Sequence, residues 1–302
     1  MKSREIYNSL VFGPSNILYW LDGRKIGLLI FHLYHRLSRS LRERPPRRER
    51  LCAIKKTVLI ILAETIGTSI LLFVGCMGCV GGLGSEPTPL QISLTFGLAV
   101  MIVIQVGIHQ FCDAHINPAI TVGSVVLGKK TIPEGLVYLL SQIVGGILGF
   151  GMLKVPISII TTLSEADMFC VTDLHSELSA IQGLLLEGIS TAILMLVACA
   201  VWDSRNVKNT DSVPIRFGLT VAALALAFGP YTGCSMNPAR SLAPALWNNQ
   251  WSHHWIYWFG PIGGALLSSF MYKTIFGVKN HTLQESDLNL IQNILATAWR
   301  TG

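Results

Sequence analysis

Charged side chains are scarce in this sequence. Asp, Glu, Lys and Arg make up 13% of the 302 residues, whereas an average soluble domain has roughly 25%. Hydrophobic residues make up 51% of the chain, and its mean hydropathy is +0.51. This composition excludes an ordinary soluble domain, a disordered chain and a nucleic-acid-binding protein. We therefore expect an integral membrane protein.

Motifs for metals and cofactors are missing as well. The seven cysteines show no CxxC…CxxC spacing. Most of them lie in or beside apolar runs, where cysteine is usually a small buried hydrophobe. We therefore expect no metal, no cofactor and no disulfide framework.

Six nearly uncharged runs approach the roughly 20 residues that a helix needs to cross a bilayer. These runs are approximately 57–79, 90–110, 133–153, 181–201, 214–229 and 254–276. We expect them to form a channel-like domain over 57–276, with an N-terminal tail over 1–56 and a C-terminal tail over 277–302. An even number of spans places both termini on the same side of the membrane.

The distribution of basic residues predicts which side that is. Thirteen of the 23 Lys and Arg residues lie in 1–56, and others lie in the links 129–130 and 205–216. The segment 154–180 instead carries four acidic residues and one lysine. Because basic loops stay in the cytoplasm, we expect both termini to be cytoplasmic. We expect the membrane to be the plasma membrane. The short apolar stretch 26–34 has basic flanks, which favours an interfacial segment over a signal peptide.

The two halves of the chain resemble each other. The sequence from Glu64 to Leu71 is echoed from Glu187 to Leu194, an offset of 187 − 64 = 123. Asn-Pro-Ala occurs at 117–119 and again at 237–239, an offset of 237 − 117 = 120. Three spans per repeat, at about 57–153 and 181–276, make the second copy enter the membrane from the opposite side. Inverted repeats of this kind place a pathway between the halves.

Each Asn-Pro-Ala motif predicts the start of a short helix. Asn is a favoured N-cap and Pro is favoured at the first helical position. The apolar segments 118–126 and 238–247 that follow have about ten residues, enough for roughly 15 Å, or half a bilayer. They are therefore predicted to be re-entrant half-helices that start beside a hydrated path. Their positive N-terminal ends would repel cations, and the Asn amides could donate hydrogen bonds to neutral solutes.

These motifs resemble the aquaporin superfamily of major intrinsic proteins over about residues 56–276. The residues that carry the resemblance are Asn117, Pro118, Ala119, Asn237, Pro238, Ala239 and the arginine that follows, Arg240. The resemblance implies an all-α membrane protein with six transmembrane helices, two half-helices and an inverted three-helix repeat. It also implies a homotetramer with one pore per subunit that passively conducts water and small uncharged solutes, without enzymatic activity.

A selectivity filter around Arg240 follows from the same resemblance. Arg240 lies three residues after Asn237, so both project from one helix face, and a lone arginine at membrane depth indicates function. The family pattern adds Phe96, Ala225 and Cys234 to this filter. Water-selective members carry histidine where this chain has Ala225, so a wider pore that admits glycerol or urea is implied.

Other positions agree only partly with the family pattern. Glycerol facilitators carry Asp where this chain has Ser241, and a small filter residue in an otherwise water-channel-like sequence resembles the insect entomoglyceroporins. By resemblance, Glu64 and Glu187 orient the re-entrant loops, and so does His115, for which gating is the alternative. Cys112-Asp113 replaces a small Ser-Gly pair, and the stretch from Phe96 to Asn117 is one residue longer than the pattern. A shift of one residue would place Gly97 in the filter.

Three alternative functions remain open from the sequence. If Phe96 and Cys234 crowd the filter, the pore is essentially restricted to water. The protein could instead be a structural or adhesive membrane protein whose pore is closed. An intramembrane enzyme would need a nucleophile or a metal cluster beside the two buried carboxylates, and the sequence offers neither.

Overall fold

The computed structural model describes residues 46–81, 86–108, 112–160 and 168–277, and these ranges contain helices and loops but no strand. The chain divides into two units, 1–55 and 56–302. All of the site residues named above belong to the second unit. The interfacial segment expected at 26–34, most of the basic N-terminal tail and the C-terminal tail from 278 onward lie outside the described residues.

Long helices occupy the six predicted spans. They are α2 (Arg47–Met77), α3 (Pro89–Val103), α6 (Ile132–Ile160), α7 (Ala180–Val201), α8 (Val213–Thr232) and α10 (Ile256–Ile275). Among the described residues, five helices are long and apolar enough to cross a membrane. The 20-residue α10 is not one of these five.

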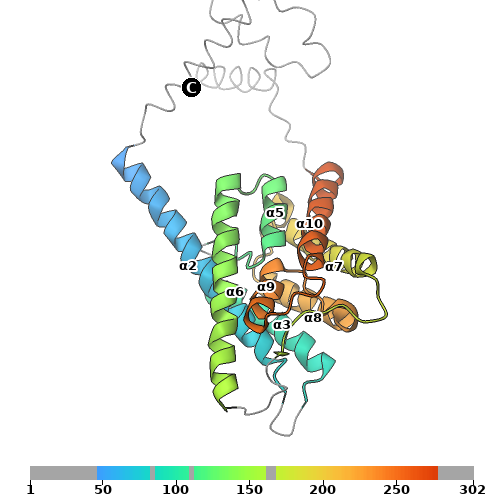
Figure 1. Ribbon diagram of the computed structural model, residues 1–302. Helices are drawn as coiled ribbons and strands as arrows, with labels where there is room; N and C mark the ends of the chain where they lie inside the picture. Colours follow the sequence, from blue (N-terminus) through green and yellow to red (C-terminus); the bar gives the residue numbers. More distant parts are fainter. Residues whose placement is uncertain (1–45, 82–85, 109–111, 161–167, 278–302) are drawn as a thin grey trace, which may run out of the picture. The chain divides into compact units, whose positions relative to one another are not determined.

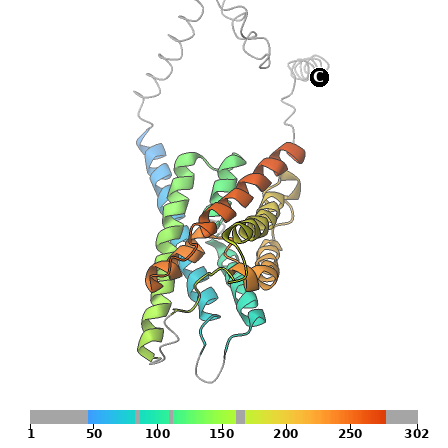
Figure 2. The same ribbon diagram turned by 45° about the vertical axis from the view of Figure 1, so that its right-hand side comes forward.

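Helices contact each other closely at equivalent places in the two repeats. A Cβ atom added to Gly145 or Gly149 of α6 would clash with the backbone of α2. One added to Gly264 of α10 would clash with the backbone of Gly188 in α7. Small residues let helix backbones approach in this way, and in Figures 1 and 2 α2 crosses beside α6. Gly263, which has the same small size, faces open space instead.

Two short helices, α5 (Pro118–Val126) and α9 (Pro238–Asn248), lie where the half-helices were predicted. A lysine binds the C-terminal end of each. Lys273 of α10 donates to the carbonyl oxygen of Val126 over 3.2 Å, and Lys154 of α6 donates to that of Trp247 over 3.3 Å. The C-terminal end of each half-helix therefore binds a lysine from the last helix of the other repeat. The positive charge of this lysine complements the negative end of the helix dipole.

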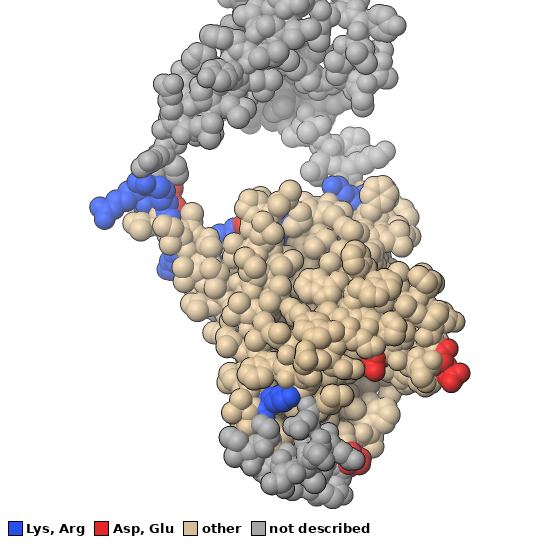
Figure 3. Space-filling view, viewed as in Figure 1, with Lys and Arg blue, Asp and Glu red and all other residues tan. Residues whose placement is uncertain are grey.

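The outer surface of this unit is apolar. Exposed side chains include Leu140, Val144 and Leu148 of α6, and Phe259 and Leu267 of α10. The face shown in Figure 3 has few charged side chains across its middle. An apolar surface of this extent would be an aggregation hazard in water, but it matches the interior of a bilayer.

The expectation that the chain has no disulfide is wrong. Cys76, in the last turn of α2, is bonded to Cys170, and the two residues are 94 positions apart in the sequence. Their Cα atoms lie 5.3 Å apart, well within the normal range for a disulfide. No motif marks this pair, because only the packing of α2 against the segment that follows α6 brings the two cysteines together. The other five cysteines are thiols.

Candidate functional site: a lined path between the half-helices

Both half-helices begin at an asparagine cap. Asn117 is extended, and its Oδ1 accepts a hydrogen bond of 2.9 Å from the amide of Ala119. Asn237 has the same conformation, and its Oδ1 accepts one of 3.0 Å from Ala239. Asn117 and Asn237 therefore cap α5 and α9 in the way that the sequence predicts.

Each cap is also held by the opposite repeat. The Nδ2 of Asn117 donates to the carbonyl oxygen of Met236, and the Nδ2 of Asn237 donates to that of Ile116, both over 2.8 Å. These bonds use one of the two amide hydrogens that each asparagine could donate to a solute. Because an amide nitrogen carries two hydrogens, one remains on each asparagine for a passing molecule.

The loops that lead into the half-helices have matching backbone conformations. Positive φ angles occur at Ala114 (47°) and Ile116 (43°) in the first loop and at Cys234 (44°) and Met236 (52°) in the second. Both pairs are related by the offset of the Asn-Pro-Ala motifs, because 234 − 114 and 236 − 116 are both 120. Non-glycine residues rarely adopt this conformation, and where they do, it clusters at functional sites.

A buried carboxylate stabilises each of these loops. Glu64 of α2 accepts hydrogen bonds from the amides of His115 (2.9 Å) and Ile116 (2.8 Å). Glu187 of α7 accepts bonds of 2.8 Å from the amides of Ser235 and Met236. Successive amides of a strained loop thus point at one carboxylate, which satisfies groups that would be costly to bury alone.

Two further side chains that the sequence analysis missed complete these carboxylate sites. Gln142 of α6 donates to Glu64 over 2.7 Å, and Thr232 of α8 donates to Glu187 over 2.6 Å. The signal for Gln142 was present, since a fully buried amide in an apolar run needs a partner. Cys112 of the unusual Cys112-Asp113 pair also donates its thiol to Glu64, over 3.2 Å.

His115 is packed rather than exposed. Its Nδ1 lies 3.1 Å from the hydroxyl of Thr121. Its ring stacks near Tyr138 and Trp202, with centroid distances of 4.6 and 5.2 Å. These contacts fix the ring against α5 and α6 and favour an orienting role over a gating one.

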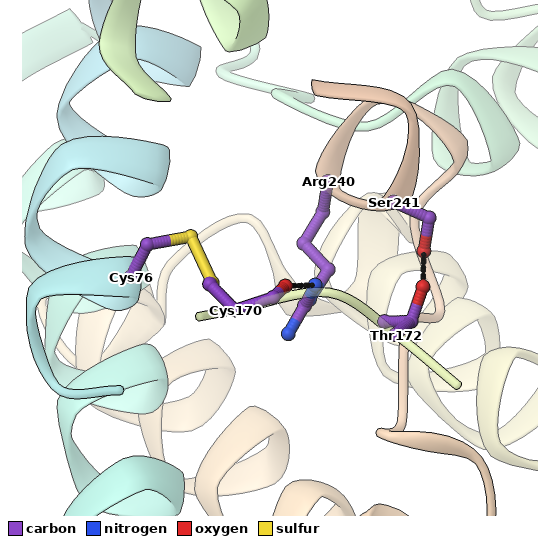
Figure 4. Close-up of a disulfide and its surroundings, with 5 residues drawn as sticks. All are labelled: Cys76, Cys170, Thr172, Arg240 and Ser241. Atoms are coloured by element: carbon purple, nitrogen blue, oxygen red, sulfur yellow. Dashed lines mark hydrogen bonds between the residues drawn. A yellow bond between two sulfur atoms is a disulfide. The ribbon is translucent and has the colours of Figure 1, made fainter. Parts of the chain in front are cut away.

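Arg240 lies in a buried position where its charge is held from two sides. The residue is only 6% exposed. Its Nη1 donates to the carbonyl oxygen of Cys170 over 2.8 Å, as Figure 4 shows. Its Cζ lies 4.7 Å from the centroid of the Phe96 ring, a distance at which a cation is attracted to an aromatic face. The guanidinium group is therefore set between a carbonyl group and a ring.

Phe96 lines the cavity that also contains Arg240. A π-helix, η2 (Ile104–Ile108), follows α3, and a π turn takes up more residues than an α turn. This wider turn lies within the stretch from Phe96 to Asn117, which is one residue longer than the family pattern. Gly97 does not face the lumen but packs against the backbone of Gly218 in α8.

One cavity of about 930 Å³ connects these groups. Both capping asparagines line it, and so do the four residues predicted for the filter: Phe96, Ala225, Cys234 and Arg240. The thiol of Cys234 donates to the carbonyl oxygen of Leu224 over 3.3 Å. Asp113, in the loop before α5, also lines the cavity. It forms a 2.7 Å ion pair with Lys130, so its carboxylate is neutralised locally.

Ser241, where glycerol facilitators carry Asp, belongs to a chain of hydroxyl groups. Thr172 donates to Ser241 over 2.7 Å, and Ser241 donates to Ser235 over 2.6 Å. Ser235 in turn donates to the carbonyl oxygen of Asn237 over 2.9 Å. This chain links the segment after Cys170 to the start of α9 without adding a charge beside Arg240.

Two half-helices that meet at a lined cavity inside a six-helix unit define a membrane channel. Among the described residues, no group of three or more His, Cys, Asp or Glu side chains could hold a metal ion. Around the filter, the candidate site combines hydrogen-bond donors and the Arg240 cation with apolar walls. These are the elements with which pores select by size and charge.

Comparison with known proteins agrees with this class. The family described as "Major intrinsic protein" matches residues 53–272. Aquaporin-4 of Mus musculus is 38% identical over 220 residues, which cover 72% of this chain and 67% of that protein. Aquaporin-2 of Rattus norvegicus is 34% identical over 225 residues, which cover 74% of this chain and 81% of that protein.

A solved structure shares the fold. The X-ray structure of the aquaglyceroporin from Plasmodium falciparum matches with a TM-score of 0.65 at 22% identity, covering 73% of this chain and 97% of that chain. This chain belongs to the major intrinsic protein family, the aquaporins. It is therefore an integral membrane channel and not an enzyme, and the predicted fold with six spans and two re-entrant half-helices is confirmed.

Proposed function

We propose that this protein passively conducts water and small uncharged solutes such as glycerol and urea, and excludes ions and protons. The observation that carries the proposal is the small, apolar Ala225 in the wall of the cavity that also contains Arg240. A methyl group at this position leaves more width than a bulky polar ring would. The likeness to entomoglyceroporins rests on the same residue together with Ser241.

The proposed roles of the lining residues follow from their contacts. Asn117 and Asn237 present their remaining amide hydrogens to the solute at the centre. Arg240 supplies charge and hydrogen bonds at the filter, and Phe96 and Cys234 set its width together with Ala225. Glu64, Glu187 and His115 hold the loops that place these groups. Ions are excluded because the positive ends of both half-helices and the guanidinium group repel cations in a narrow, partly dry passage.

A pore restricted to water is the second candidate. It is favoured by the Phe96 ring, which lines the same cavity as Ala225 and lies against Arg240. If this ring and the Cys234 side chain fill the space that the absent imidazole leaves, glycerol would not fit. A closed, purely structural protein would show neither flux.

We further propose that both termini are cytoplasmic in the plasma membrane. The Cys76–Cys170 disulfide supports this orientation because disulfides persist on the oxidising side of a membrane. Cys170 lies in the acidic link between α6 and α7, which is predicted to lie on the opposite side of the membrane from the basic links.

We also infer a homotetramer, in which part of the exposed apolar surface contacts other subunits. Cross-linking of the purified protein tests this inference.

Stopped-flow light scattering on proteoliposomes tests the function directly. Water and glycerol permeability of the purified protein are compared with those of empty vesicles, and urea is tested in the same way. We expect both permeabilities to exceed the background. Fast water flux with background glycerol flux would move the assignment to the water-restricted pore, and background values for both would overturn the channel proposal.

A further inference from the structure

The single disulfide described here is attached to the wall that holds Arg240. Cys170 uses its sulfur to bond to Cys76 of α2 and its carbonyl oxygen to accept the Arg240 hydrogen bond. Figure 4 shows the two connections meeting at this one residue. The same residue therefore joins α2 through its side chain and contacts the guanidinium group of Arg240 through its backbone.

The backbone at Cys170 needs to be held in place. Its φ angle is +65°, in the left-handed region that costs a non-glycine residue roughly 1–2 kcal/mol. Two hydrogen bonds anchor the chain beyond it. Thr172 donates to Ser241 over 2.7 Å, and the amide of His175 donates to the carbonyl oxygen of Tyr231 over 2.9 Å. Both anchors follow Cys170 in the sequence, so the disulfide is the covalent restraint at Cys170 itself.

The position of this carbonyl group controls where the guanidinium group lies. Arg240 is almost fully buried, and a buried donor must keep an acceptor. The ring of Phe96 limits its movement on one side. If the Cys170 carbonyl withdrew, the guanidinium group would donate its hydrogen bonds to molecules in the lumen instead, and would project into the passage.

We propose that the Cys76–Cys170 disulfide is a positioning element of the selectivity filter. By fixing the Cys170 carbonyl it holds Arg240 against the wall, so that cleavage of the disulfide narrows the passage and changes the solute selectivity of the pore. This inference rests on the proposed pore-lining role of Arg240. It adds Cys76 and Cys170 to the residues that determine specificity, although neither needs to touch the solute.

Reduction with a water-soluble phosphine provides a reversible way to cleave the bond. The phosphine and one water molecule supply two electrons and two protons, which convert the disulfide into two thiols, while the phosphine takes up the oxygen as phosphine oxide. Mild oxidation by a small disulfide then restores the bond by thiol exchange. Protein mass measured after alkylation reports how much disulfide is present at each stage.

The experiment compares five proteins in proteoliposomes: wild type, Cys76→Ser, Cys170→Ser, the double variant and Cys199→Ser as a matched control. Cys199 is a buried thiol of α7 that does not line the cavity. We expect the ratio of glycerol to water permeability to fall by about twofold to tenfold in the first three variants, as expected for the loss of one hydrogen bond. Reduced wild type should show the same ratio, reoxidation should restore it, and the phosphine should not change the three variants.

Backbone hydrogen–deuterium exchange gives a readout that does not depend on flux. Cleavage should speed exchange in 168–178 and at the start of α9, with a smaller effect at the start of α5, which is coupled to α9 only through the Asn117 and Asn237 hydrogen bonds. If wild type passes water but no glycerol, the proposed solute range fails, and water permeability together with exchange still tests the disulfide.

Two results would overturn the positioning role. In the first, disulfide-free protein has the permeability ratio and the α9 exchange of wild type. In the second, the fluxes of water and of glycerol both fall in proportion to the loss of folded protein. That result is expected if the disulfide only stabilises the fold.

Discussion

Asn237 donates its side-chain amide to the carbonyl oxygen of Ile116 over 2.8 Å, so the cap of the second half-helix is fixed by the loop of the first. The reciprocal bond from Asn117 to Met236 has the same length. The two repeats therefore determine each other's geometry at the centre of the pore. A change in either loop is expected to affect both half-helices.

Asn237→Asp tests this cross-link. A carboxylate can still cap α9, but it cannot donate to Ile116, and the unsatisfied carbonyl group should cost about 1–3 kcal/mol. We expect a lower thermal midpoint in detergent and lower water permeability. Gln91→Glu, at an exposed position of α3, makes the same amide-to-carboxylate change, is the control and should match wild type. A variant at position 237 as stable as the control would contradict the importance of the cross-link.

Glu187→Gln tests the orientation of the second loop. The carboxylate accepts bonds from Thr232, Ser235 and Met236, whereas an amide would turn an N–H group toward donors. We expect a loss of about 1–3 kcal/mol in stability and a fall in water permeability, measured by thermal unfolding and stopped-flow scattering. Glu177→Gln, at an exposed position, serves as the control for the lost charge. Unchanged permeability in Glu187→Gln would argue against the orienting role.

The two half-helices and the carboxylates beside their loops could be predicted from the sequence, because the residues that specify them are close together in the chain and occur in both repeats. An asparagine followed by proline specifies a helix start wherever the surrounding chain is apolar, and α5 and α9 begin at the predicted residues. Glu64 and Glu187 stood out because a carboxylate in an apolar span must be satisfied. The offset between the repeats then related each loop to its counterpart.

The features that were missed depend on contacts between distant parts of the chain. The Cys76–Cys170 disulfide could not be predicted, because the segment that contains Cys170 has no periodic pattern and cysteines in apolar runs are usually thiols. The hydrogen-bond acceptor for Arg240 is the backbone carbonyl group of Cys170. Because every residue has such a group, the sequence carries no signal for this contact. The π turn after α3 likewise left only a one-residue difference in length as its signal.

Ala225→His tests the width of the filter. An imidazole ring in place of a methyl group should lower glycerol permeability at least about tenfold while water permeability stays close to that of wild type. Stopped-flow scattering with both solutes measures the change, and Ala225→Ser, which is nearly the same size, should retain glycerol flux. Equal glycerol flux in wild type and Ala225→His would refute the argument from size.

Cys234 should make the pore sensitive to small mercurials. Its thiol lies on the cavity wall, and a bound metal would obstruct the passage. We expect the reagent to block water and glycerol flux in wild type and to have little effect on Cys234→Ser. Cys79 lines the same cavity and is the competing target, so Cys79→Ser should remain sensitive. If Cys79→Ser were the resistant variant, the assignment would move to Cys79.

The lysines at the ends of the half-helices should stabilise the fold without setting selectivity. Lys154 and Lys273 bind the last carbonyl groups of α9 and α5, where a cation contributes about 0.3–1 kcal/mol. Lys154→Met and Lys273→Met should each lower the thermal midpoint, and their effects should add because the sites belong to different half-helices. Lys208→Met, in an exposed loop, is the control. A changed ratio of glycerol to water permeability in either variant would show that the charge acts on the filter and not only on the helix end.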